Sequence, residues 1–325
     1  MKLLFVTIGT KGSSELKDLL GFVDADIKLQ NIVPDLITAT NDIIDLIGKP
    51  VYDKVVELYA EGNFEEENNH IIYSVRYPIA VNAYRLFTPS NDLAHTNNGR
   101  KMRQDENEKQ AFEWMLDRDN AALEKRYYRA LDDLIKFLDN CENTELKNLW
   151  KASDAYKKTH DLFIRTVAEF DSFFPINSRL LLIKLAPGIS DCEQYEIRSR
   201  IGNEKFNALK QALKENTPIT EAKDLELIRL IRKASVAYSM SWSMMRFSVQ
   251  MYPEGVLQHV TSDRATTRGA KPTLKSETEA ARQAFKSDFD RAAIEIEDLV
   301  APPIPVDESQ NILPEPMSGS NYFSA

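Results

Sequence analysis

The stretch that decides the fold runs from residue 34 to residue 59 and reads PDLITATNDIIDLIGKPVYDKVVELY. Its apolar side chains recur every three or four positions, the spacing that gives a helix one buried face. These side chains are Ile37, Ile43, Ile44, Ile47, Val51, Val55, Leu58 and Tyr59. Gly48 and Pro50 interrupt the pattern, so we expect a helical segment that is broken in its middle.

The same periodicity continues on both sides of this stretch. It predicts a short helix over residues 15–21, a helix carrying Arg76 over residues 72–87, and longer helices over residues 105–138 and 145–170. Between residues 88 and 104 the pattern changes, and Asn98-Gly99 is a strong signal for a tight hairpin turn. We therefore expect a β-hairpin inserted between two helices.

The second half of the sequence repeats the order of these parts. Ile201-Gly202 follows Ile47-Gly48 by 154 positions, and Arg232 follows Arg76 by 156. A second turn-rich region at 252–271 matches the first hairpin in position, and a capped helix comes after it. Two helical segments can agree this far by coincidence, which is the alternative to a true duplication.

These patterns predict a mainly α fold with two related helical-bundle units, each with an inserted β-hairpin, and extended N- and C-terminal arms. The expected divisions are an N-terminal arm and short helix (1–33), a first unit (34–172, hairpin near 88–104), a second unit (173–300, hairpin near 252–271) and a proline-rich arm (301–325).

Composition excludes several classes of protein. The chain has 50 acidic and 41 basic side chains and a net charge of -9, so its average surface repels nucleic acid. No apolar run approaches the roughly 20 residues that cross a bilayer, so we expect a soluble protein without a membrane partner. The two cysteines are far apart and no CxxC occurs, which argues against a disulfide framework or a zinc site.

Catalytic and cofactor signatures are absent from the sequence. The four histidines are widely separated, and none belongs to an HExxH or HxxxH pair. The Gly-rich stretch at residues 9–14 lacks the residue order of a phosphate-binding loop. We therefore expect no enzyme activity, no catalytic residues, no cofactor and no metal.

Two groups of residues are candidates for partner contacts. Basic side chains gather in the hairpin regions, where they suggest contact with DNA or an acidic partner, although solvated loop charge is an equal alternative: Arg100, Lys101, Arg103, Arg264, Arg268 and Lys271. The C-terminal arm offers apolar and proline contacts to a neighbour, unless it is a disordered tail: Pro302, Pro305, Ile312, Leu313 and Phe323.

Three segments resemble an uncharacterised family of phage and prophage virion proteins associated with the head-tail connector (adaptor) proteins of tailed phages. They are IIDLIGKPVYDKVVELY at residues 43–59, RYPIAVNAYRLF at 76–87, and residues 110–138 with Trp114 and the ending LIKFL. The Asn-Gly hairpin lies between the last two. The resemblance covers roughly residues 10–160, and its motifs are packing patterns rather than catalytic signatures.

The resemblance implies a structural protein of the virion, assembled in the host cytoplasm. Its expected role is a homo-oligomeric ring, of twelve copies, that docks to the portal, contacts downstream tail or stopper proteins, and forms part of the conduit through which DNA passes. The chain is much longer than small connectors, which leaves its copy number open. A tail-completion or minor capsid protein is the alternative, and a nucleic-acid processing enzyme is a third possibility.

Overall fold

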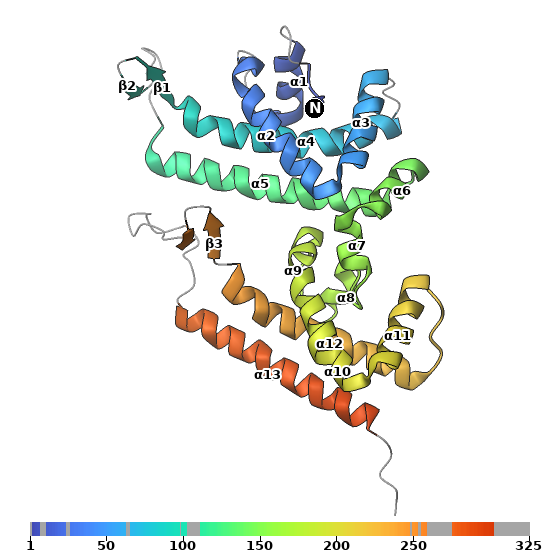
Figure 1. The fold of residues 1–325 in the computed structure, drawn as a ribbon. Helices are drawn as coiled ribbons and strands as arrows, with labels where there is room; N and C mark the ends of the chain where they lie inside the picture. The colour runs from blue at the N-terminus through green and yellow to red at the C-terminus, as the bar shows by residue number, and fades with distance from the viewer. Residues whose placement is uncertain are drawn as a thin grey trace, which may run out of the picture.

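The computed structural model describes residues 2–6, 11–23, 27–62, 66–97, 99–102, 111–247, 249–252, 255–258 and 275–301. Over these residues the chain is mainly α, as the periodicity predicted. Figure 1 shows two groups of helices, one above the other, that follow each other along the chain. No helix in the described residues is both long enough and apolar enough to cross a membrane.

We call residues 2–160 the first half of the chain. Its elements are, in order, α1 (Lys11–Leu20), α2 (Leu29–Ile47), α3 (Lys49–Glu61), α4 (Glu66–Asn91), β1 (Leu93–Thr96), β2 (Gly99–Met102), α5 (Glu113–Asn140), α6 (Thr144–Ala152) and α7 (Asp154–His160). The long helix α4 packs against both α2 and α5.

We call residues 161–301 the second half. Its elements are α8 (Val167–Asp171), α9 (Arg179–Asp191), a π-helical turn η1 (Cys192–Ile197), α10 (Arg198–Ile201), α11 (Asn203–Glu215), α12 (Ala222–Arg246), β3 (Val249–Tyr252), β4 (Gly255–Gln258) and α13 (Lys275–Val300). Here α12 packs against α13 and α9.

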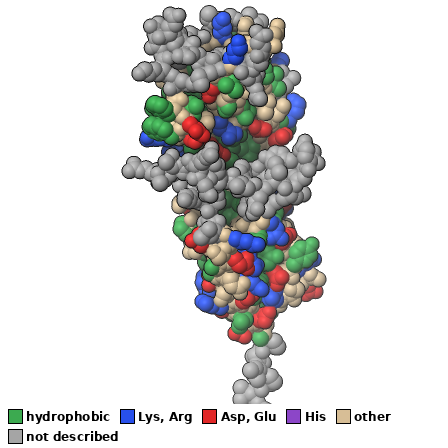
Figure 2. Space-filling view, turned by 90° about the vertical axis from the view of Figure 1, so that its left-hand side faces the viewer, with side chains coloured by type: hydrophobic (Ala, Val, Ile, Leu, Met, Phe, Trp, Pro, Cys, Tyr) green, Lys and Arg blue, Asp and Glu red, His purple; other side chains and the backbone are tan. Residues whose placement is uncertain are grey.

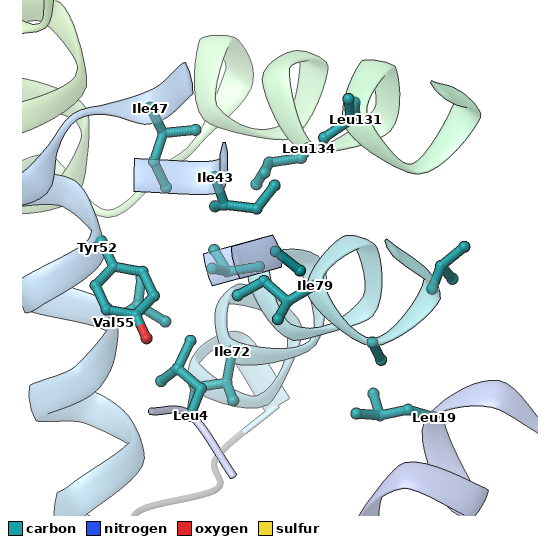
Figure 3. Packing of buried hydrophobic residues seen from close by; sticks show 14 of the residues in the cluster. Leu4, Leu19, Ile43, Ile47, Tyr52, Val55, Ile72, Ile79, Leu131 and Leu134 are labelled. Carbon is teal, nitrogen blue, oxygen red and sulfur yellow. The ribbon is translucent and has the colours of Figure 1, made fainter. Parts of the chain in front are cut away.

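The first half closes around one apolar core. Ile43 of α2, Ile79 of α4 and Leu134 of α5 meet at its centre and are almost completely buried (Figure 3). A fully buried side chain of this size stabilises a fold by roughly 1.5–3 kcal/mol relative to an exposed one. The apolar period of residues 34–59 therefore reports the face that α2 and α3 turn toward α4, except at Ile37, which was expected on this face and is 43% exposed.

Two smaller clusters hold the second half together. One contains Phe163, Phe206 and Ile231, and the other contains Phe170 and Leu185. Phe163 and Phe206 meet edge to face with ring centroids 5.5 Å apart. Because Phe163 and Phe170 belong to these clusters, the segment around them packs with the second half and not with the first.

Each half contains one pair of short antiparallel strands. In the first, Leu93 pairs with Met102 and Thr96 with Gly99. In the second, β3 and β4 lie at the start of the predicted region 252–271 and partly before it, and residues 259–274 are outside the described part of the chain. The strands have four residues each, too few to add a sheet layer to a mainly α fold.

Residues 2–6 are extended, and they lie against the first core, where Leu4 and Phe5 are buried. One expectation about the extent of a helix is wrong. The single helix expected over residues 145–170 is divided, because Ser153 caps a new helix and its side chain accepts the Tyr156 N–H. A local cap overrides the periodic pattern there.

Candidate functional site

The structure describes only part of the predicted contact residues. Arg100 and Lys101 lie on β2, opposite His95 and Ala94, and the Lys101 side chain is exposed. The remaining predicted residues lie outside the described part of the chain: Arg103, Arg264, Arg268, Lys271, Pro302, Pro305, Ile312, Leu313 and Phe323. Whether the basic residues of the two halves come together therefore stays a prediction.

Charges of both signs are mixed on the face that Figure 2 draws. Figure 2 shows lysine and arginine beside aspartate and glutamate, with no broad patch of one sign on this face. An interspersed surface does not steer a polyanion over its whole area. The most buried ion pairs lie inside the two halves and at the junction between them.

A first charged cluster, which we call the first clasp, joins α4 to the N-terminal segment. The Nη2 of Arg76 lies 2.8 Å from Oε2 of Glu15 on α1, and both side chains are mostly buried. The same carboxylate accepts the N–H of Val6 (3.2 Å) and the hydroxyl of Tyr59 (3.0 Å). One ion pair thus ties α4, α1, α3 and the extended N-terminal segment together.

Aromatic rings enclose this ion pair. The Arg76 guanidinium carbon lies 4.8 Å from the ring centroid of Phe5 and 5.0 Å from that of Tyr59. Burial raises the pKa of Tyr59 to about 12, with Glu15 adding to the effect and Arg76 opposing it. The phenol therefore stays protonated at neutral pH and donates its hydrogen bond to Glu15.

A second clasp repeats this arrangement in the second half. Arg232 of α12 places Nη2 2.6 Å from Oε1 of Glu169 on α8, and its Nε donates to the Phe163 carbonyl at 3.0 Å. Oε2 of Glu169 accepts the N–H groups of Arg165 (2.7 Å) and Thr166 (3.1 Å). Burial is the main cause that lowers the pKa of Arg232. In both halves an arginine of a long helix forms an ion pair with a glutamate, and the same glutamate accepts a backbone N–H of an extended segment.

A glycine with the same backbone conformation joins consecutive helices in each half. Gly48 has φ 89° and ψ 143°, and Gly202 has φ 81° and ψ 154°. This region is open almost only to glycine, because a Cβ clashes with the backbone there. Each glycine ends one helix and begins the next, so the break predicted at residue 48 is confirmed.

The pattern of buried and exposed residues along α4 is almost the same as that along α12. When residues 71–90 are placed beside 227–246, the two helices differ in burial only at Ser74 against Leu230 and at Asn82 against Tyr238. Arg76 then falls beside Arg232. Such agreement over several turns means that both helices are covered by neighbours in the same pattern.

The stretch from a helix proline to the helix-joining glycine is one residue longer in the second half than in the first. Pro34 and Pro187, both inside helices, are 153 positions apart, whereas Gly48 and Gly202 are 154 apart. The π-helical turn Cys192–Ile197 lies between Pro187 and Gly202. A π-turn accommodates one residue more than the α-helix it replaces, so it accounts for the difference.

The π-turn brings a buried ion pair that the first half lacks. Glu193 is fully buried, its Oε1 accepts the Phe163 N–H at 2.7 Å, and its Oε2 lies 2.8 Å from Nζ of Lys210. The approach of Lys210 is close enough for an ion pair but lacks the angles of a hydrogen bond. Burial raises the pKa of Glu193, while Lys210 and the Phe163 N–H oppose that rise. The corresponding positions in the first half hold Thr40 and Val56.

A junction of polar contacts fixes the second half to the first. Oδ1 of Asp132 on α5 accepts the backbone N–H groups of Arg179 (2.5 Å) and Leu180 (2.9 Å) and the hydroxyl of Ser178 (3.2 Å). A carboxylate is favoured at this point because the first N–H groups of a helix point outward and carry partial positive charge. Asp132 thereby caps α9 from the other half of the molecule.

The side chain of Arg179 completes the junction. It is 3% exposed; its Nε donates to Asp139 at 2.7 Å and its Nη2 to the Thr159 hydroxyl at 2.8 Å. Asp139 also accepts the indole N–H of Trp150 at 2.9 Å. These bonds connect α5, α6, α7 and α9, so the two halves are held in one orientation.

A groove of about 560 Å³ opens beside this junction, between α7, α9 and α11. Its walls carry Lys157, Lys158 and Lys210, but also Asp154 and Asp161. The mixed charges give the groove no preference for an anion or a cation. Among the described residues no group of histidine, cysteine, aspartate or glutamate is arranged to hold a metal ion.

Most residues of the clasps and the junction were not predicted from the sequence. Arg76 and Arg232 were recognised as corresponding positions, but their partners Glu15 and Glu169 were not. A signal existed for Glu169, because Thr166-x-x-Glu169 has the spacing of a capping box and forms one. Glu15 had no such local signal, because its partners lie far away in the sequence.

Comparison with known proteins gives one match. Residues 43–160 match the model of a family of unknown function (DUF6712). No curated protein and no solved structure matches the chain. The matched range begins in α2 and ends at the last residue of α7, which is the end of the first half as defined by its packing.

Proposed function

We propose that the chain is a structural protein of a tailed-phage virion, a head-tail connector that forms a ring beneath the portal. Support for the virion role comes from the resemblance carried by residues 43–59, 76–87 and 110–138. Support for a structural rather than a catalytic role comes from the charged groups of the two halves. Arg76, Glu15, Arg232 and Glu169 are used to join segments of the chain to each other.

The repeated clasp is the observation that carries the proposal. Related units of this kind are expected in a protein that presents similar surfaces more than once. We propose that the chain consists of two related helical units, each with a strand pair between its two long helices. The correspondence of Gly48 with Gly202, and the one residue taken up by the π-turn, support this duplication over coincidence.

The packing favours a different division of these units from residues 34–172 and 173–300. Leu4 and Phe5 pack with the first unit, and Phe163 and Phe170 with the second. We therefore propose that the first unit begins at the N-terminal segment and that the second begins near residue 161.

The strand pairs supply the proposed contact with DNA. Both lie on the same side of the molecule (Figure 1). Arg100 and Lys101 belong to the first pair. In a ring, one side of every subunit faces the lumen, and basic side chains there meet passing phosphates without reading sequence. The proline-rich segment 301–325 is proposed to contact a neighbouring subunit.

Electron microscopy of the purified chain, alone and with the portal protein of the same phage, tests the proposal. The expected result is a closed ring on the portal, with twelve copies of the chain. Six copies would place twelve units in the ring and would also agree with a duplicated chain. A chain that stays monomeric beside the portal, or that is found elsewhere on the virion, would replace the connector role with that of another virion component.

A further inference from the structure

The side of α5 that carries Asp132 continues beyond the junction and is open there. Positions three and four residues apart share one side of a helix, so five residues before Asp132 lie on the same side. We call them the α5 stripe: Trp114, Arg118, Ala121, Lys125 and Tyr128. All five are exposed, Trp114 to 55% and Tyr128 to 44%. The stripe occupies the part of α5 that extends beyond α9 to the left of Figure 1.

The α5 stripe combines aromatic rings with positive charge. No ion pair joins Arg118 or Lys125 to another described residue, so both charges are available to a partner. Nζ of Lys184 on α9 adds a further cation, 5.3 Å from the ring centroid of Tyr128. Aromatic side chains and arginine are enriched where proteins bind each other. The composition of the stripe therefore fits a partner that is both apolar and acidic.

Neighbouring carboxylates do not cancel this charge. Asp117 and Glu124 lie at one edge of the stripe, and Glu124 is already close to Arg85, with a carboxylate oxygen 3.9 Å from Nη1. Arg129 lies at the other edge, is exposed and offsets Asp117. The stripe and its edges therefore remain positive.

α13 shows that helix packing does not require these residues. Tyr127 and Leu134 of α5 are buried as Phe289 and Ile296 of α13 are, and both pairs lie 162 positions apart. The same shift places these residues at the positions of the stripe: Ser276, Ala280, Gln283, Ser287 and Asp290. With the same buried face, α13 thus has no aromatic ring, lysine or arginine at these positions. The α5 stripe is consequently free to serve binding.

We propose that residues 302–325 of a second copy bind the α5 stripe. This inference rests on the proposed contact of the C-terminal arm with a neighbouring subunit, and it names the surface that receives the arm. The segment contains Asp307, Glu308 and Glu315 but no lysine or arginine, so its charge is opposite to that of the stripe. Residues 302–305 read PPIP, the PxxP spacing of segments that dock on aromatic-lined surfaces.

The lengths of the segment and the stripe agree with this occupant. From Trp114 to Tyr128 the stripe is about 21 Å long, a distance that about seven residues cover in a polyproline conformation. The rest of residues 302–325 can span between copies. Since α13 ends at the bottom of Figure 1, the segment would have to run back along this helix, over about 39 Å, to reach its own stripe. A second copy can place its stripe beside the end of α13.

Photo-cross-linking in the full chain tests the contact. A benzophenone amino acid replaces Ala121, which is exposed in the middle of the stripe. Photolysis of the concentrated chain is expected to give a covalent dimer, in which peptide mapping finds position 121 attached to residues 302–325. The same amino acid at Gln283, the corresponding exposed position on α13, is the control and is expected to give no such product.

Three outcomes would overturn the proposal. The first is a yield of this product at position 121 no higher than at Gln283. The second is a product of this kind found only at the mass of one chain, because the segment then binds its own stripe. The third is attachment of position 121 to an added single-stranded oligonucleotide and not to the segment, since aromatic and basic side chains also bind single-stranded nucleic acid.

A charge variant tests the same contact by a second route. Arg118→Ala with Lys125→Ser gives the stripe the residues of α13 and is expected to lower the dimer yield roughly 2- to 30-fold. Lys286→Ser with Arg291→Ala removes the same charge from exposed positions of α13 and is expected to leave the yield unchanged. Equal yields from the two variants would overturn the proposal. Retained helical circular dichroism establishes that both variants are folded.

The cross-link also separates this inference from the connector role. If the chain forms a ring on the portal and position 121 gives no product with residues 302–325 in that ring, the contact is excluded and the connector role stands. If the product forms as expected but the chain never binds a portal, the contact stands and the connector role is lost.

Discussion

The two clasps join similar parts of the two halves by different lengths of chain. In the first, Glu15 accepts an N–H from a residue nine positions before it; in the second, Glu169 accepts one from four positions before it. The helix that carries the glutamate has ten residues in the first half (α1) and five in the second (α8). The arginine, the carboxylate and the anchored N–H are retained while the helix that carries the carboxylate is halved. What both units keep is the position of the carboxylate.

A second difference between the halves is the buried polar residue, which is Thr40 in the first half and Glu193 in the second. Thr40 in the first unit satisfies its own hydroxyl by donating to the Leu36 carbonyl at 2.6 Å. The second unit replaces it with Glu193, whose charge needs Lys210 and the Phe163 N–H. At these corresponding buried positions the first half therefore has a neutral hydroxyl and the second half has a carboxylate in an ion pair. Substitutions that convert one into the other test how far the units are equivalent.

The largest expected effect comes from removing a clasp arginine. Arg76→Met and Arg232→Met each leave a largely buried carboxylate without its partner, which costs about 3–5 kcal/mol of unfolding free energy. Urea denaturation of each variant measures the loss. Arg229→Met is the control, because Arg229 pairs with Glu226 on the surface of α12. A loss no greater than that of the control at either clasp would break the equivalence of the two units.

The buried pair of the second unit gives the next effect. Lys210→Val alone is expected to lower the unfolding free energy by about 3–5 kcal/mol, because Glu193 is then buried without a counter-charge. Combining it with Glu193→Thr recreates the residues of the first unit and is expected to recover most of that loss. A double variant as unstable as Lys210→Val would mean that the π-turn requires the carboxylate. Denaturant unfolding of the three proteins gives the answer.

The same carboxylate predicts a pH dependence of stability in the second half. Burial raises the pKa of Glu193 above its value in the unfolded chain, so the native state binds the proton more tightly. Its contribution to stability is therefore greatest below the unfolded pKa and is lost as the pH rises through the folded pKa. The stability difference between the native protein and Glu193→Gln should shrink or change sign over that rise. Unfolding at a series of pH values measures it, and a constant difference would contradict the prediction.

The two helix-joining glycines should respond alike and more weakly. Gly48→Ala and Gly202→Ala force a Cβ into a positive-φ conformation, which costs on the order of 1–3 kcal/mol. Beyond its chain neighbours, neither added Cβ meets an atom closer than 3.5 Å, so the cost comes from the local backbone and not from tertiary contacts. Equal losses in thermal or urea unfolding would support the equivalence of the two breaks. A loss at one glycine alone would show that the other break tolerates a different backbone.

The smallest effect is expected where the units differ on the surface. Lys49 and Asp53 form an exposed ion pair in α3, and the corresponding residues of α11 are Asn203 and Asn207. Exposed pairs contribute roughly 0.2–1 kcal/mol, and those four residues apart on a helix contribute about 0.3–0.5 kcal/mol. Lys49→Asn with Asp53→Asn should therefore change the unfolding free energy by no more than about 0.5 kcal/mol. A larger loss would assign this pair a role that α11 does without.

The apolar period predicted helices well where a helix buries one continuous face. It located the long helix around Arg76 and the break at Gly48, because both depend on neighbours within a few residues. It was misled at Phe112 and Met115, which were expected to face inward but are 69% and 44% exposed. Periodicity reports apolar side chains but does not identify the surface that covers them.

By itself the sequence determined the helical class and the two glycine breaks, and it predicted the correspondence of Arg76 with Arg232. These features follow from spacing and from backbone conformations that only certain residues adopt. Only the tertiary structure decided which carboxylate each arginine meets, and that Asp132 caps α9 across the junction. The atoms of these contacts come from residues 46 to 63 positions apart. No local pattern encodes such pairs, because they form only when helices pack and exclude water from charges that then require partners.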